Sequence, residues 1–258
     1  MTSWPTITRH NLLGVLISTI NMQQAVEAIH NWIDLGKKEY VCVVPAHSIM
    51  EAHQHVELRP VFNQAGMCTP DGMGVVWSLK LAGIRNIDRV YGPDLMLAIS
   101  DVSVKEGWSH FYFGGTPEVL DRLIETMQAR FPGIRVAGSY SPPFRPLHPE
   151  EDNNIIEQIN SSGADIIWVG LGSPKQEKWM AEHRTLLKAP VLVGVGAAFD
   201  FLSGTKPQAP RWVQRSGLEW LYRFAHEPGR LWQRYIQYPR FVLLVLAQQL
   251  GIIRFSDH

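Results

Sequence analysis

Polar residues that could bind an anion crowd the segment GLGSPKQE, residues 170–177, directly after the apolar run ADIIWV. Ser173 is a good helix N-cap residue, and Pro174 suits the first helical position. Gln176 stands at the third position, where a capping box needs a side chain that reaches back. The segment therefore predicts a helix that begins with this capping box.

The same segment carries residues that helix initiation does not explain. Lys175 and Glu177 lie at the predicted helix N-terminus, where backbone N–H groups and the helix dipole favour an anion. Gly170 and Gly172 would let a phosphate approach the backbone. A phosphate-bearing ligand is the chemistry that this composition favours, although Lys175 stands where a dinucleotide fingerprint has its third glycine.

Three other turns combine glycines with polar residues: the first two precede a predicted helix, and the third ends a buried strand with Asp200. They are TPDGMGVVW (69–77), FGGTPEVL (113–120) and VGVGAAFDF (193–201). Asp71 lies in the first and Asp200 in the last, and each is a turn or capping residue in one interpretation. In the other, a carboxylate in a partly desolvated pocket serves as a general base for an alcohol.

Several kinds of site are disfavoured by spacing. His47, His53 and His55 form H-x5-H-x-H, which is not the spacing of a helical metal pair, so we expect no metal site there. GTK at 204–206 lacks the Gly-Lys pair of a phosphate-binding loop, and no GxSxG nucleophile elbow occurs. We also expect no nucleic-acid partner.

The elements that must position these turns follow one alternating pattern. Short runs rich in Val and Ile alternate with helical patterns from residue 40 to about residue 200. This order predicts a mostly parallel, Rossmann-like sheet flanked by helices. The runs 166–169 and 191–195 are apolar throughout, as a sheet buried on both faces requires. Ligands of such sheets bind at the loops beyond the carboxyl ends of the strands, where the four turns would build one site.

Composition divides the 258 residues into an acidic body and a basic tail. Formal net charge is zero, yet from Thr205 onward eight Lys or Arg face three acids, which makes the tail +5 and the body −5. Tryptophans lie among these arginines, and strand-like runs stop. We expect a catalytic α/β domain over 1–206 and an appendage of two or three helices over 207–258. Such a tail suggests contact with an anionic membrane or with phosphates.

Cysteine use and hydropathy bear on the compartment. Cys42 and Cys68 lie in apolar stretches with no redox or metal spacing, as in a reducing cytosol. The N-terminus has no basic segment that leads through an apolar one to a small-residue cleavage site, so we expect no secretory signal. The apolar run 241–253 is shorter than the roughly 20 residues that span a bilayer. We expect it to lie on a membrane and not to cross one.

Five motifs in one order give the sequence a recognisable likeness. They are PDGMG (70–74), RVYGPDL (89–95), GLGSPKQE (170–177), GVGAAFDFLSG (194–204) and GLEWLYRFAHEPGRLWQRY (217–235). The chain resembles the WecG/TagA/CpsF family of bacterial glycosyltransferases over nearly its whole length. The resemblance implies transfer of a sugar from a nucleotide diphosphate donor, usually a UDP-sugar, to a sugar on a polyprenyl diphosphate at the cytoplasmic membrane face. It implies an inverting, metal-independent enzyme of cell-envelope or exopolysaccharide biosynthesis.

The resemblance also assigns roles by motif. The aspartate of PDG, here Asp71, is the proposed base. Gly172, Lys175, Gln176, Glu177 and Asp200 would line the donor pocket, with Arg89 and Asp94 at its edge, and Arg223, Arg230 and Arg234 would face the diphosphates. On one continuous helix these three arginines would share a face, but Pro228 interrupts that helix.

One departure concerns the donor sugar. In the teichoic-acid branch a Thr-Pro-Asn turn follows the second strand, and Val44, Pro45 and Ala46 take its place here. The absence of two polar groups counts against an N-acetylmannosamine-type donor and leaves room for glucose or another hexose, unless His47 or Ser48 substitutes for the missing groups. N-acetylmannosamine, its uronic acid and glucose are therefore the candidate sugars. Two other functions stay open: a nucleotide-dependent oxidoreductase and a non-catalytic membrane-docking scaffold. Association into a homo-oligomer is also left open.

Overall fold

The computed structural model describes residues 7–255, except the side chains of Arg230, Gln233 and Arg234. The chain forms two compact units. Unit 1 consists of residues up to Gln24, 43–91 and 208 onward, and unit 2 consists of residues 25–42 and 92–207. Helix α1 (Met22–Asp34) and strand β3 (Glu39–Val44) each pass from one unit to the other along the chain.

Unit 2 contains most of the predicted parallel sheet. Its strands are β5 (Ser109–Gly114), β6 (Arg135–Tyr140), β7 (Ile166–Gly170) and β8 (Val191–Gly194), joined by residues 39–42 of β3. The whole sheet has the order β4-β3-β8-β7-β5-β6. The pairs β3–β8, β8–β7, β7–β5 and β5–β6 are all parallel, which confirms the predicted fold class.

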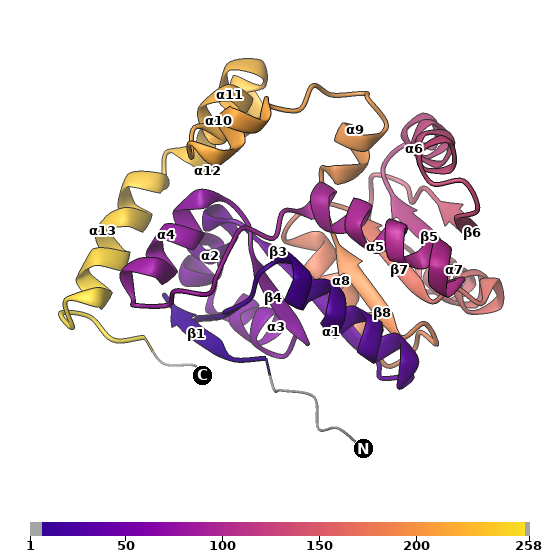
Figure 1. Ribbon diagram of the computed structural model, residues 1–258, viewed down its shortest axis with the longest axis horizontal. Helices are drawn as coiled ribbons and strands as arrows, with labels where there is room; N and C mark the ends of the chain where they lie inside the picture. Colours follow the sequence, from indigo (N-terminus) through magenta and orange to yellow (C-terminus); the bar gives the residue numbers. More distant parts are fainter. Residues whose placement is uncertain (1–6, 256–258) are drawn as a thin grey trace. The chain divides into compact units, whose positions relative to one another are not determined.

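Helices cover this sheet as the alternating pattern predicts (Figure 1). They are α5 (Gly92–Glu106), α6 (Pro117–Arg130), α7 (Pro149–Ser162), α8 (Lys175–His183) and the short α9 (Ala198–Leu202). Helix α8 packs on β7 and β8, and α6 and α7 pack on β6. Every residue of β5 and β8 is buried, because neither face of a covered sheet reaches water.

Unit 1 is built around strand β4 (Met67–Pro70) and the antiparallel hairpin of β1 (Arg9–Leu12) and β2 (Val15–Ser18). Strand β2 lies against β4 and also packs on α2 (Ala46–Gln54) and α3 (Arg59–Asn63). A short 3-10 helix (Val56–Leu58) joins these two helices, and α4 (Met73–Leu81) follows β4.

The C-terminal segment folds with unit 1 as four helices, so the expected two or three were too few. They are α10 (Arg211–Arg215), α11 (Glu219–His226), α12 (Pro228–Tyr235) and α13 (Tyr238–Gln249). Helix α13 packs against α2, burying Phe241 and Val245 (Figure 1). Gln248 completes the anchor, because its side chain accepts from Leu13 N at 3.0 Å and donates to Asn11 O at 2.9 Å.

Much of the apolar surface of this C-terminal segment is exposed. The exposed large apolar side chains of α13 are Val242, Leu243 and Leu246, and Leu250 follows directly after the helix. Within residues 7–255, no helix has both the length and the apolar character that crossing a membrane requires.

Candidate active site

Asp71 lies in a turn that the backbone holds on two sides. Its N–H donates to Val44 O at 3.1 Å, and the preceding Pro70 O accepts from Val90 N at 3.0 Å. Gly72 follows with φ +83°, a left-handed conformation that glycine adopts without steric cost, and α4 begins at the next residue. The sequence PDG therefore fixes the carboxylate at the end of a buried strand.

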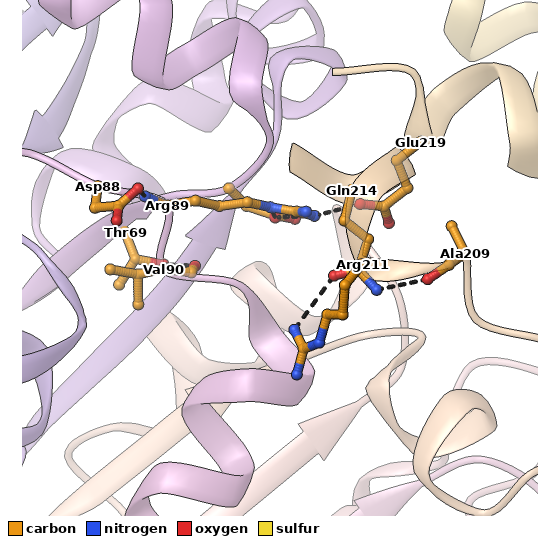
Figure 2. Close-up of polar contacts among 9 residues, drawn as sticks. Thr69, Asp88, Arg89, Val90, Ala209, Arg211, Gln214 and Glu219 are labelled. Carbon is orange, nitrogen blue, oxygen red and sulfur yellow. Dashed lines mark hydrogen bonds and ion pairs between the residues drawn. The ribbon is translucent and has the colours of Figure 1, made fainter. Parts of the chain in front are cut away.

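Arg89 joins Asp71 to a glutamate far along the chain. Its Nε and Nη2 donate to Asp71 Oδ1 at 3.3 and 3.2 Å, and Nη2 also lies 2.7 Å from Glu219 Oε2. Figure 2 shows the Arg89 side chain extending toward Glu219 of α11. All three side chains are at most 16% exposed. This cluster of Asp71, Arg89 and Glu219 lies wholly in unit 1.

An aromatic ring lies against the charge of Arg89. The Arg89 guanidinium lies over the Tyr91 ring at 4.0 Å, a cation–π contact. Burial by itself would lower the pKa of Arg89, but Asp71, Glu219 and Tyr91 raise it above its ordinary value. Burial raises the pKa of Glu219, with Arg89 opposing that shift.

Arg223 brings a second cation to this cluster, one turn beyond Glu219 on α11. Burial would lower its pKa, but Tyr235, Tyr91, Glu219 and Asp71 together raise it, which places all of these groups within electrostatic reach. Of the predicted set, Asp71 and Arg89 are thus in contact, and Arg223 lies within electrostatic reach of Asp71.

The turn that presents Glu219 is held by packing of the C-terminal segment. Gly217 has φ +76°, and a Cβ built there would meet the Trp77 ring at 2.4 Å. In α10, Gln214 donates to Ala209 O at 2.7 Å and accepts from Arg211, as Figure 2 shows. The turn therefore depends on a glycine that lets the Trp77 ring come close.

Two of the predicted arginines fall outside the described side chains: Arg230 and Arg234. Their helix α12 is separate from α11, because Pro228 begins a new helix after Glu227. A single helix that aligns Arg223 with both does not form, as the proline indicates.

The predicted donor residues after β7 form a connected group in unit 2. Gln176 Oε1 accepts from Gly172 N at 3.2 Å, and Gln176 Nε2 donates to Glu177 Oε1 at 2.9 Å. Both side chains are buried, whereas Lys175 is exposed at the first position of α8. The structure brings Gly172, Gln176 and Glu177 together.

The predicted capping box in this segment is wrong. Helix α8 begins at Lys175 with Pro174 at the N-cap, and no side chain caps it. Gln176 lies at the second helical position, and its side chain accepts from the N–H of Gly172. The reason is that the Gln176 side-chain amide forms its hydrogen bonds with Gly172 of the turn and with the buried Glu177.

The glycines at the ends of the strands are required for different structural reasons. A Cβ on Gly170 would lie 2.5 Å from the Phe199 ring, and one on Gly114 would lie 2.6 Å from the backbone of Gly170. Close packing therefore explains these two. Gly172 has φ +79° and open space around its Cβ direction, so its backbone conformation requires glycine and nothing fills the space.

The two remaining predicted acids lie in other elements of unit 2. Asp200 is not at the end of a strand as expected, because β8 stops at Gly194 and Asp200 falls in α9. It pairs with Lys206 at 2.9 Å. Asp94 lies in the first turn of α5, where the helix dipole stabilises a carboxylate.

The turn that departs from the teichoic-acid pattern lies beside Asp71. Val44 ends β3 buried, its carbonyl accepts from Asp71 N, and Pro45 is the N-cap of α2. Thr116, in another predicted turn, accepts from Val119 N as the N-cap of α6, which confirms that helix start.

Glu219 and Tyr91 were missed as site residues by sequence reasoning. Glu219 lies in the motif GLEWLYRF and Tyr91 in RVYGPDL, so the motifs that hold them were the signal that could have indicated both residues. Among residues 7–255, no group of three His, Cys, Asp or Glu is placed to hold a metal ion.

Comparison with known proteins places these motifs in a family. Residues 10–254 match the model of the glycosyl transferase WecG/TagA/CpsF family. An N-acetylglucosaminyldiphosphoundecaprenol N-acetyl-beta-D-mannosaminyltransferase of Bacillus spizizenii is 32% identical over 218 residues, which are 84% of this chain and 82% of that protein. The protein of the same name from Bacillus subtilis strain 168 is 29% identical over 237 residues, 92% of this chain and 81% of the relative.

Proposed function

Because this chain belongs to the WecG/TagA/CpsF family of glycosyl transferases, we propose that it moves a hexose from a UDP-sugar to a sugar carried on a polyprenyl diphosphate. The two Bacillus relatives are named for transfer of N-acetylmannosamine to N-acetylglucosaminyldiphosphoundecaprenol. The product would feed a polymer of the cell envelope, such as an exopolysaccharide.

Asp71 is the general base of this reaction. An inverting transfer occurs in one displacement: an acceptor hydroxyl attacks the anomeric carbon, the bond to UDP breaks, and one carboxylate takes the hydroxyl proton. Both Arg89 donors contact Oδ1 of Asp71, so Oδ2 is the oxygen to which we assign the proton. This asymmetric arrangement of a largely buried carboxylate is the observation that carries the proposal.

The donor lies at the group after β7. Gly172, Lys175 and the N-terminus of α8 suit the diphosphate, since backbone N–H groups and a lysine favour phosphate oxygens. Gln176 and Glu177, which contact each other, orient that turn, and Asp200 and Asp94 belong to the same proposed set of donor residues. Metal independence is a prediction, tested by comparing transfer with and without a chelator.

The acceptor diphosphate is proposed to meet arginines of the C-terminal segment. Arg223 would bind its oxygens in the planar fork that suits phosphate, and we assign the same role to Arg230 and Arg234. The exposed apolar residues of α13 and the basic character of this segment suit the anionic inner surface of the cytoplasmic membrane. We therefore propose peripheral attachment there.

The first experiment is calorimetric binding of UDP, UDP-N-acetylmannosamine, its uronic acid and UDP-glucose, with and without a divalent metal. The proposal predicts binding of UDP that a chelator does not weaken, with one sugar preferred. N-acetylmannosamine is the first sugar to test, since the relatives are named for it. Preference for UDP-glucose would point to the Val44–Ala46 departure. Failure of every UDP compound to bind would contradict the proposal.

A further inference from the structure

Arg89 divides its guanidinium unequally between two carboxylates. Its Nη2 lies 2.7 Å from Glu219 Oε2, while Nη2 and Nε approach Asp71 at 3.2 and 3.3 Å. The contact with Glu219 is the shorter one and is an ion pair, whereas the two contacts with Asp71 are hydrogen bonds. Both contacts with Asp71 use Oδ1, so the two-oxygen fork that arginine forms with a carboxylate is absent at Asp71.

This division matters for a carboxylate that must accept a proton. An arginine paired with Asp71 alone would stabilise the ionised form and make Asp71 a poorer base. A neighbourhood without a cation would leave the buried carboxylate without orientation. Glu219 resolves the conflict, because its carboxylate lies closer to Arg89 Nη2 and shares the charge of Arg89, while Asp71 keeps two long, orienting hydrogen bonds.

The other charged and titratable groups around Asp71 do not replace Glu219. Tyr91 lies under Arg89, and burial raises the pKa of its phenol, so it stays neutral. Tyr238 is neutral for the same reason. Arg223 is the second nearby cation, with Tyr235 beside it. Among the described side chains, Glu219 is thus the acid that balances Arg89 against Asp71.

We propose that Glu219 is a positioning residue for Asp71: it holds Arg89 and shares its charge, so that Asp71 stays oriented while keeping its capacity to accept a proton. This inference rests on the proposed role of Asp71 as base. It gives the C-terminal segment a part in the proton transfer, beyond binding of phosphates.

The test compares Glu219→Gln, Glu219→Asp and the control Glu125→Gln, which removes a carboxylate from the exposed face of α6. Sugar transfer is followed across pH for each protein. In Glu219→Gln we expect kcat to fall about tenfold, KM for the UDP-sugar to stay within about twofold, and the acid limb of the rate profile to move down by about one pH unit. Glu219→Asp restores most of the rate, and Glu125→Gln behaves as wild type.

A second readout does not depend on transfer. The 13C carboxyl resonance of Asp71, assigned by its loss in Asp71→Asn, is titrated in the wild type and in Glu219→Gln. A lower midpoint in the variant supports charge sharing even if no UDP-sugar is turned over. Absence of turnover would count against the proposed function alone. An unchanged midpoint overturns the inference. Full activity of Glu219→Gln also overturns the inference. The same holds if its loss of rate equals its loss of folded protein and the acid limb of its pH–rate profile does not move.

Discussion

Arg89 Nη2 lies 2.7 Å from Glu219 Oε2, and this contact joins the loop between α4 and α5 to the first turn of α11. Both side chains are 12% exposed. Because charges with so little access to water are costly unless paired, the contact requires α11 to be in place beside the turn of Asp71. The C-terminal segment is therefore part of the candidate active site.

The turn before α11 should be sensitive to a single methyl group. In Gly217→Ala, the new Cβ would enter the Trp77 ring, and φ +76° is unfavourable for alanine. We expect the free energy of unfolding to fall by about 1–3 kcal/mol, measured by urea denaturation. Gly229→Ala is the control, because that glycine lies in α12 with no atom within 4 Å of the added Cβ. Equal stability of the two variants would contradict the packing described here.

His110 should make stability depend on pH. It is fully buried, its Nδ1 accepts from Trp168 Nε1 at 2.8 Å, and burial lowers its pKa from 6.5 to about 4. The unfolded chain therefore binds a proton between about pH 6.5 and pH 4 that the folded protein does not, and stability is lost as pH falls through this window. Between about pH 7.5 and pH 5 the loss from this residue is about 2 kcal/mol.

The pH effect is measured by urea denaturation of the wild type and His110→Gln at both pH values. The variant has no imidazole at this site, so its free energy of unfolding should fall less on acidification, whatever its stability at neutral pH. The same loss in both proteins would show that His110 does not carry the effect.

Sequence reasoning reached the fold because the alternation of Val- and Ile-rich runs with helices is a local pattern. Strands such as Ile166–Gly170 are apolar throughout, and that alone indicates a sheet covered on both faces. The place of Asp71 in a turn between a strand and a helix was also predicted, since the motif PDG is visible in the sequence.

The rest of the site could not be found from the sequence because it depends on contacts between distant residues. Glu219 has a role only through Arg89, and no spacing in the sequence connects the two. Gln176 was misassigned to a capping box because its spacing fits one, while its side chain bonds to Gly172 and Glu177 instead. Gly170 suggested a phosphate, but the packing of Phe199 accounts for it.

Membrane attachment should depend on the exposed apolar residues of α13. In Leu243→Glu, a side chain that is 68% exposed would bring a charge to the lipid surface, and binding to vesicles that contain anionic lipid should weaken about tenfold or more. Co-sedimentation measures this binding. Gln128→Glu adds the same charge on the exposed face of α6 and should bind as the wild type does. If both variants bind equally well, α13 is not the attachment surface.

One comparison of initial rates decides whether Asp71 is the base of a UDP-sugar transferase. Transfer from UDP-N-acetylmannosamine to an N-acetylglucosaminyl-diphosphoprenol acceptor is measured for the wild type and Asp71→Asn, with UDP affinity measured beside it. We predict that Asp71→Asn loses at least about 100-fold in kcat and keeps its UDP affinity, because the amide cannot take the proton of the acceptor hydroxyl. Transfer by Asp71→Asn at the wild-type rate would show that Asp71 is not the base.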